Sequence, residues 1–246
     1  MTSRHHPRPK PSERQVVVRE VTRIAPEVTY LALDWAEPEP RFDFLAGQWV
    51  RVHFPIPGGE ETRSLSIANP PSFEGGLELA ALTRRGGRFA RFVTADLRPG
   101  HSLRVKGPYG VFHLPQEIDH DPIFATESVG VTAIRSMVLD LFERGTSAQV
   151  DLLFGAAREE ELLFRDEFEA LAARHPNFRV TWVLTRPPEG WTGAAGDLSG
   201  ALRALLAGGG NRKVWMSGFS FSLNPLADIL AELRFPADRI EVERYD

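Results

Sequence analysis

A turn between a short apolar segment and a helical pattern is the first stretch whose residues could bind a ligand. The stretch reads FATESVGVTAIRSM, residues 124–137, and its one glycine is Gly130. A helix that opens directly after a strand presents free backbone N–H groups and a positive dipole end, which favour the phosphates of a nucleotide. The pattern therefore predicts a dinucleotide site that includes Gly130 and Thr132, with an ordinary strand-to-helix turn as the alternative for Gly130.

Two residues of this turn oppose that chemistry. Glu127 and Ser128 stand where a glycine permits close approach of the backbone to phosphate. Glu127 brings a negative charge to a place suited to anions, and Ser128 adds a Cβ that disfavours the positive φ open to glycine. We therefore expect weak binding of a nucleotide at this turn.

A second set of candidate residues lies in TRSLSIA, residues 62–68. The planar fork of Arg63 suits a pyrophosphate, and Ser66 supplies a hydroxyl. Alternate side chains of a strand share a face, so Arg63 and Ser66 lie on opposite faces unless the run bends or the ligand wraps its end. In isolation, a solvated arginine and a strand serine would be the simpler interpretation.

A third candidate is the glycine pair that opens a helical pattern in RRGGRFARFVTADL, residues 84–97. After Gly87, free backbone N–H groups near Ala90 and Arg91 could face a pyrophosphate. The arginines of this stretch indicate phosphate binding or partner docking, although a run of charge is more often a solvated face. They are Arg84, Arg85, Arg88 and Arg91.

The elements that must position these residues fall into two halves. Between residues 15 and 114, short β-like runs alternate with Pro and Gly turns, which predicts an antiparallel β-barrel. From residue 121 onward each apolar run is followed by a helix-length amphipathic segment, which predicts a doubly wound, five-stranded parallel sheet. We expect a disordered arm at 1–14, a barrel domain at 15–116 and an α/β domain at 117–246.

The expected strands of the second half are PIFAT, AQVDLLFG, FRVTWVLT, KVWMSG and RIEVE, and the expected helices are VTAIRSMVLDLFERG, REEELLFRDEFEALAARH, DLSGALRALLAG and NPLADILAELR. Ligands of such sheets bind outside the carboxyl ends of the strands. A site between the two domains is therefore the expected arrangement.

Composition excludes several other classes of function. The net charge of −4 argues against nucleic acid as a partner, and no apolar run approaches the roughly 18 residues of a membrane span. The chain has no cysteine, which excludes disulfides and a cysteine-ligated iron–sulfur cluster within it. Its seven histidines show no zinc-hydrolase spacing, so we expect no metal. The first residues lack the apolar core of a secretory signal, so we expect a cytoplasmic protein.

Eight segments, in order and spacing, resemble the ferredoxin reductase family of flavoproteins, and the match covers the chain after the arm. They are AGQWVRVHF, TRSLSIANP, LRPGHSLRVKGPYGVF, TESVGVTAIRSM, FGAAREEELLFRDEF, LTRPPEGWTGAAGD, VWMSGFSFS and IEVERYD. The resemblance implies a Greek-key barrel that binds FAD, followed by a domain that binds NAD(P)H.

The resemblance also implies roles for individual residues. Arg63 pairs with the FAD pyrophosphate, Ser66 bonds the flavin edge near N5, and Tyr245 covers the flavin ring, with a frayed tail as its alternative. Further contacts to FAD are implied for Leu65, Ala81, Leu82, Gly87, Phe89 and Ala90. Contacts to the nicotinamide nucleotide are implied for Ser217 and Gly218, in addition to the turn residues named above, and Ser217 is a catalytic candidate with Ser66 and Tyr245. Arg186 ends the third expected strand, where an arginine could meet the 2′-phosphate of NADPH, with a turn arginine before two prolines as its alternative.

This chain also departs from the family pattern. Leu65 replaces a frequent tyrosine and Ala90 a frequent hydroxyl residue, and Ser217 and Phe219 stand in a position usually read C-G-P. The segment around Arg186 resembles members that use NADH more than members that use NADPH.

The leading hypothesis is an FAD enzyme that takes hydride from NAD(P)H and passes electrons singly to a separate protein, such as a ferredoxin or an oxygenase. One alternative is a flavin-binding relay or interaction subunit that has lost nicotinamide use. A weaker alternative is a non-redox protein that retains only the fold.

Overall fold

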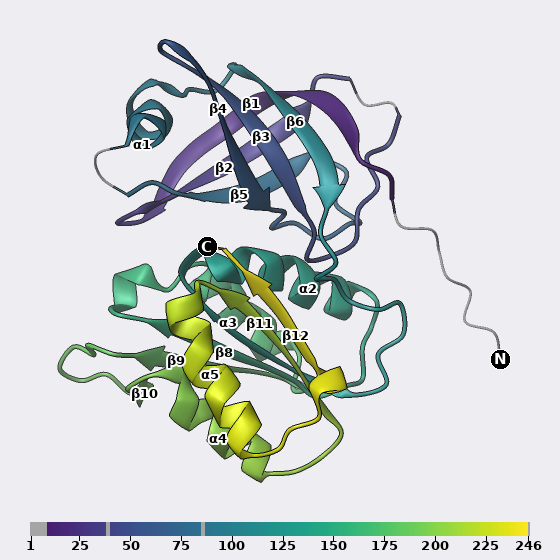
Figure 1. The fold of residues 1–246 in the computed structure, drawn as a ribbon, viewed down its shortest axis with the longest axis vertical. Coiled ribbons are helices and arrows are strands. Elements are labelled where there is room, and N and C mark those ends of the chain that lie inside the picture. Colours follow the sequence, from purple (N-terminus) through teal and green to yellow (C-terminus); the bar gives the residue numbers. More distant parts are fainter. Residues whose placement is uncertain (1–8, 38–39, 85–86, 246) are drawn as a thin grey trace. The chain divides into compact units, whose positions relative to one another are not determined.

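The computed structural model describes residues 9–37, 40–84 and 87–245, which form two compact units. The first unit contains the residues up to Arg23 together with Glu27–Leu114 and Arg135–Asp140. The second contains Ile24–Pro26, Pro115–Ile134 and the residues from Leu141 onward. Figure 1 labels the elements of both. The domain ranges 15–116 and 117–246 stay a prediction.

The first unit is built on a six-stranded sheet that curls on itself (Figure 1). Its strands are β1 (Ser12–Ala25), β2 (Val28–Trp35), β3 (Trp49–Ile56), β4 (Gly59–Ser66), β5 (Leu77–Leu82) and β6 (Ser102–Tyr109), in the order β4-β3-β6-β1-β2-β5. An antiparallel bridge between Ile67 and Leu79 joins the two edges of the sheet. The predicted antiparallel barrel is confirmed.

The core of the barrel follows from strict alternation along β3. Val50, Val52, Phe54 and Ile56 are buried and the residues between them are not. A strand points successive side chains to opposite faces, so these four fill the barrel interior. A helix packs on this core through the ring of Phe89, which meets the ring of Phe54 edge-on at 4.9 Å.

That helix is α1 (Arg88–Arg91), which continues into a π-helical turn at Phe92–Asp96. It lies where the sequence predicted a helix after Gly87. One prediction about the arm needs correction, because Ser12, Glu13 and Arg14 lie in β1 and pair with residues 105–107 of β6. The backbone hydrogen bonds of this ladder extend the barrel into the last three residues of the predicted arm. Residues 1–8 of the arm lie outside the described residues.

The second unit contains a parallel sheet in the order β10-β9-β8-β7-β11-β12. Its strands are β7 (Asp121–Glu127), β8 (Val150–Ala156), β9 (Phe178–Leu184), β10 (Ala194–Ala195), β11 (Arg212–Gly218) and β12 (Ile240–Arg244). The five predicted strands are confirmed. The sixth, β10, has two residues, and its pair of alanines gave no apolar run that a sequence pattern could detect.

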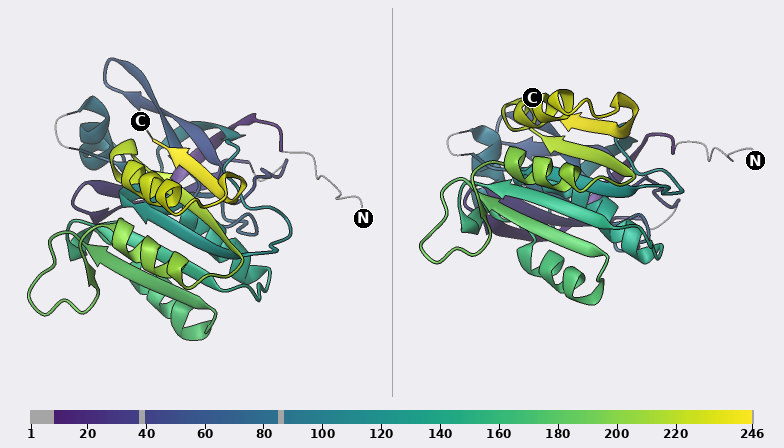
Figure 2. Two further views of the ribbon diagram at one scale, coloured as in Figure 1. Left: turned by 60° about the horizontal axis from the view of Figure 1, so that its bottom comes forward. Right: turned by 90° about the horizontal axis from the view of Figure 1, so that it is seen from below.

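Helices cover both faces of this sheet, as expected for a doubly wound fold. They are α2 (Val131–Glu143), α3 (Arg165–Arg174), α4 (Leu198–Ala207) and α5 (Ser220–Glu232). Helices α4 and α5 lie on one face and α3 lies on the other (Figure 2). Among the described residues, no helix is both long and apolar enough to cross a membrane.

Helix α4 begins at Leu198, one residue after the predicted Asp197, and two other helices begin a turn or more from the predicted residue. Helix α3 begins at Arg165 rather than Arg158, because Glu159–Glu161 form a separate 3-10 turn and Phe164 has a left-handed φ of 57°. Helix α5 begins at Ser220 rather than Asn224. Proline is usual only in the first turn of a helix, so the sequence favoured a start beside Pro225, which instead lies inside α5.

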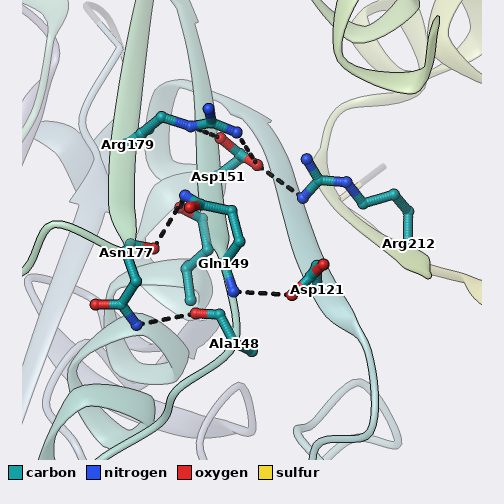
Figure 3. A network of polar contacts seen from close by, with 8 residues as sticks. Asp121, Ala148, Gln149, Asp151, Asn177, Arg179 and Arg212 are labelled. Carbon is teal, nitrogen blue, oxygen red and sulfur yellow. Dashed lines mark hydrogen bonds and ion pairs between the residues drawn. The ribbon is translucent and has the colours of Figure 1, made fainter. Parts of the chain in front are cut away.

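A network of polar contacts joins the amino ends of four strands (Figure 3). The buried carboxylate of Asp151 in β8 accepts hydrogen bonds from Nε of Arg179 at 2.8 Å and from a terminal nitrogen of Arg212 at 2.8 Å. Asp121 accepts a hydrogen bond from the backbone N–H of Gln149 at 2.8 Å. The network therefore holds β9, β8, β7 and β11 in register at the end of the sheet opposite the expected ligand site.

Candidate functional site

The carboxyl ends of β7 and β11 are joined by two buried hydroxyl groups. Thr126 Oγ1 donates to the carbonyl oxygen of Ser217 at 2.8 Å, and Ser217 Oγ donates to the carbonyl oxygen of Gly130 at 2.8 Å. Both residues are fully buried. The sequence predicted a catalytic role for Ser217. In the structure its hydroxyl group links the turn after β7 to β11.

Gly130 is required by this close packing. A Cβ at Gly130 would lie 2.3 Å from the carbonyl oxygen of Ser217 and 2.5 Å from Thr126 Oγ1. Both distances are far below van der Waals contact. This clash explains why an ordinary strand-to-helix turn, the alternative interpretation of Gly130, requires glycine here. The glycine allows the start of α2 to lie close to the carboxyl edge of the sheet.

The other turn residues adopt a glycine-like path. Ser128 has a φ of 52°, in the left-handed region, although we expected its side chain to disfavour that conformation. The turn continues directly into α2, and the hydroxyl of Thr132 donates to the carbonyl oxygen of Val129. Thr132 is buried, so its side chain stabilises the turn from within.

Glu127 has a partner that the sequence did not reveal. Its Oε2 accepts a hydrogen bond from the hydroxyl of Ser222 at 2.6 Å. A Cβ at Gly155 would lie 3.0 Å from Glu127 Oε1, so the carboxylate lies against the end of β8 as well. Ser222 is 95 residues away in the sequence, and only the fold of β11 into α5 brings it to β7.

The carboxyl end of β11 carries an aromatic cluster. The rings of Phe219 and Phe221 stack with centroids 5.8 Å apart, and the ring of Tyr245 meets Phe219 edge-on at 6.1 Å. The backbone N–H of Tyr245 donates to the carbonyl oxygen of Gly218 at 3.1 Å. Tyr245 is therefore held beside β11, and Phe221 is 70% exposed.

Arg186 follows β9 at the same edge of the sheet. Its backbone N–H donates to the carbonyl oxygen of Ala157 at 3.0 Å, and its side chain is exposed. The sheet thus brings Glu127, Gly130, Arg186, Ser217 and Gly218 to one edge, as the sequence predicted for the carboxyl ends of parallel strands.

Glu243 is a titratable residue of this region that the sequence analysis missed. It lies in β12 opposite Ser217, and burial raises the pKa of its carboxyl group above the ordinary value. Removal from water penalises the charged form of an acid. A signal was present in IEVERYD, where Glu243 precedes Tyr245 by two residues and so shares its side of an extended chain.

The raised pKa of Glu243 predicts a pH dependence of stability. The unfolded chain releases this proton at a lower pH than the folded chain, so the stability that depends on it is full below the unfolded pKa and declines as pH rises through the folded pKa. Glu243→Gln cannot ionise. We expect its free energy of unfolding, relative to the native chain, to increase as pH rises above the ordinary glutamate pKa of about 4.3.

Urea unfolding at several pH values measures this difference. The control is Glu117→Gln, which removes an exposed carboxylate from the same unit. If the free energies of unfolding of Glu243→Gln and Glu117→Gln change with pH in the same way, burial of Glu243 has no effect on stability.

In the barrel, Arg63 lies over an aromatic ring. Its guanidinium carbon is 4.4 Å from the centroid of the Phe89 ring, and one terminal nitrogen donates to Glu61 Oε2 at 2.7 Å. The other terminal nitrogen donates to the carbonyl oxygen of Thr62 at 2.8 Å. The side chain of Arg63 is 42% exposed, so a fixed and charged fork of donors faces outward beside α1.

The remaining barrel candidates divide by burial. Gly87 is exposed, and a Cβ there would meet no atom within 4 Å. It is the N-cap of α1, and its carbonyl oxygen accepts from the backbone N–H of Arg91 at 3.1 Å. The N–H groups before Arg91 belong to the first turn, which has no acceptors within a helix. Leu65, Ser66 and Ala90 are buried but keep 7% to 9% of their surface exposed. Ala81 is fully buried in β5, so neither its side chain nor its backbone is exposed to a ligand.

Comparison with known proteins gives both units a family. Residues 15–114 match the family model of the oxidoreductase FAD-binding domain, and residues 128–223 match that of the oxidoreductase NAD-binding domain. Ferredoxin–NADP reductase B of Sorangium cellulosum is 33% identical over 244 residues, which cover 96% of this chain and 98% of that protein. The chain belongs to the ferredoxin reductase family.

Two further relatives support this assignment. The reductase component DmpP of phenol 2-monooxygenase from Pseudomonas sp. (strain CF600) is 35% identical over 93% of this chain. The match spans 64% of DmpP, so the chain corresponds to part of that relative. The crystal structure of the Amycolatopsis cytochrome P450 reductase GcoB has a TM-score of 0.86 at 25% identity, covering 96% of this chain and 70% of GcoB.

Membership of the ferredoxin reductase family makes the chain an NAD(P)H-dependent flavoprotein reductase with FAD as its cofactor. The barrel residues fit FAD, because a pyrophosphate needs donors such as the outward fork of Arg63, which bonds Glu61 and Thr62 in this structure, and the first N–H groups of α1. The second unit has at Gly130 a strand-to-helix turn of the kind that accepts a nucleotide, and the carboxylate of Glu127 lies in the same turn. Bound FAD supplies the exchange between two-electron and one-electron chemistry.

Proposed function

We propose that this chain is the reductase of an electron-transfer system, and that it passes electrons from NAD(P)H to a ferredoxin or an oxygenase component on a separate chain. One observation carries the proposal. The chain has a unit for FAD and a unit for the nucleotide, but no cysteine with which to hold an iron–sulfur cluster. An iron–sulfur cluster that receives the electrons must therefore be bound by residues outside this 246-residue sequence.

The names of the relatives support a protein acceptor. They include a ferredoxin–NADP reductase and the reductase component of phenol 2-monooxygenase. We place the reaction in the cytoplasm, where NADH and NADPH are abundant. NADH is the donor that the resemblance around Arg186 favours.

The chain's own residues have distinct tasks in this proposal. Arg63 and the N–H groups after Gly87 hold the pyrophosphate of FAD, and Ser66 lies at the flavin edge. Leu65, Ala81, Leu82, Phe89 and Ala90 form the surroundings of the cofactor. At the sheet edge, Gly130, Ser217 and Gly218 shape the surface that receives the nucleotide, and Tyr245 covers the flavin ring where the nicotinamide must enter.

Anaerobic mixing of the purified protein with NADH tests the function. We expect a yellow protein whose flavin absorbance is bleached by NADH and restored by a one-electron acceptor such as ferredoxin. A yellow protein that NADH does not bleach would identify a relay subunit without nicotinamide use. A protein that stays colourless after addition of FAD would exclude the flavin function.

The role of Tyr245 gives a separate prediction. If its ring covers the flavin, Tyr245→Ala should shift the flavin absorbance spectrum and speed reduction by NADH, because a lid no longer has to move. Tyr245→Phe keeps the ring and should behave as the native protein. Stopped-flow absorbance measures both quantities, and an unchanged spectrum and rate in Tyr245→Ala would show that the tail merely frays.

A further inference from the structure

The carboxylate of Glu127 lies across the edge of the sheet where a nucleotide is expected. Ser222 holds it with a hydrogen bond of 2.6 Å, and the side chain also lies against Gly155 at the end of β8. The carbonyl oxygen of Glu127 is 3.9 Å from the position of a Cβ on Gly218. Glu127 thus spans the carboxyl ends of β8, β7 and β11, which are adjacent strands.

The carboxylate also reaches the first turn of helix α5 through Ser222. Helix α5 has 13 residues, and its N-cap residue, Phe219, makes no side-chain cap. Neighbouring α4 is capped by Asp197, whose carboxylate accepts from the backbone N–H of Ser199 at 2.9 Å. Because Ser222 lies in the first turn of α5, its bond to Glu127 brings a negative charge to the positive end of this helix dipole.

We propose that Glu127, positioned by Ser222, is a built-in anion that competes with the phosphates of NAD(P)H and keeps nucleotide affinity low. The inference rests on the proposed use of NAD(P)H and names the residues that set its affinity. A nucleotide that reaches this edge either tolerates a like charge a few ångströms from its phosphates or displaces the carboxylate. Displacement breaks the charge-assisted hydrogen bond from Ser222.

Three variants separate the effect of the Glu127 charge from the effect of its positioning by Ser222. Glu127→Gln keeps the shape and an acceptor for Ser222 but removes the charge, so we expect nucleotide binding to tighten tenfold or more, equivalent to about 1.4 kcal/mol. Ser222→Ala leaves the charge but frees the carboxylate to be displaced, so we expect a smaller tightening, about threefold. The double variant should bind no more tightly than Glu127→Gln, because Ser222 acts only through the charge of Glu127.

Calorimetric titration of the oxidised, FAD-loaded protein with NAD⁺, NADP⁺ and ADP measures these affinities without turnover. Two controls lie at the same edge. Glu161→Gln neutralises a carboxylate that accepts from the backbone N–H of Ala157, just beyond β8. Ser199→Ala removes a hydroxyl from the first turn of α4 instead of α5. We expect neither control to tighten binding, and FAD content should be the same in all variants.

Three results would overturn the inference. One is equal affinity in Glu127→Gln and the native protein. Another is equal tightening by Glu161→Gln, which would indicate a general effect of charge. The third is a gain from Ser222→Ala that persists beside Glu127→Gln. If NADH still reduces the flavin in any of these cases, only this inference fails. If no form binds nucleotide and NADH reduces none of them, the proposed function fails with it.

Discussion

Replacing Arg63 with alanine is expected to weaken the binding of FAD by about tenfold to a hundredfold. Arg63 presents a fixed fork beside α1, with 42% of its side chain exposed. A charge-assisted hydrogen bond of this kind contributes about 1.5 to 3 kcal/mol, and each 1.4 kcal/mol is a factor of ten in affinity. Titration of the cofactor-free protein with FAD, followed by flavin fluorescence, measures the change.

Two further variants define the cause of that loss. Arg63→Lys keeps the charge without the planar fork, so its affinity for FAD should lie between those of the native protein and Arg63→Ala. Arg19→Ala removes an arginine of similar exposure in β1, which pairs with Asp34 at 3.6 Å. We expect Arg19→Ala to bind FAD normally. Native affinity in Arg63→Ala would place the pyrophosphate elsewhere on the barrel.

The fold was predictable because its signals are local. Alternation along β3 and the apolar runs of the parallel strands depend on residues that are close in the sequence. The predictions failed where the local sequence gave no pattern or an ambiguous one. The two residues of β10 are too few for a period, and Pro225 lies inside a helix that it was expected to begin.

The site was predictable only in outline for the same reason. The order of strands and helices predicted that Glu127, Ser217 and Gly218 meet at one edge, since this follows from topology. Which atoms bond there could not be predicted. The partnership of Glu127 with Ser222 depends on two elements 95 residues apart, and neither residue type indicates the other.

Asp151 shows most clearly how far stability depends on such distant partners. Asp151→Ala should lower the free energy of unfolding by about 3 to 5 kcal/mol, the range for breaking a buried ion pair by removal of one partner. The side chain of Asp151 is 3% exposed and that of Arg212 is 11% exposed, so the variant leaves a buried guanidinium without its carboxylate. Asp151→Asn keeps one acceptor oxygen in place and should lose less.

Urea unfolding followed by circular dichroism measures both variants. The matched control is Glu232→Ala, which breaks the exposed ion pair with Arg203 and should change stability by less than about 1 kcal/mol. A loss in Asp151→Ala as small as in that control would contradict the role of the network. The affinities for FAD and NAD⁺ should remain native in Asp151→Asn. Asp151 lies near the amino end of β8, whereas Glu127 is the last residue of β7, so the sheet separates the residues that stabilise it from those that meet the nucleotide.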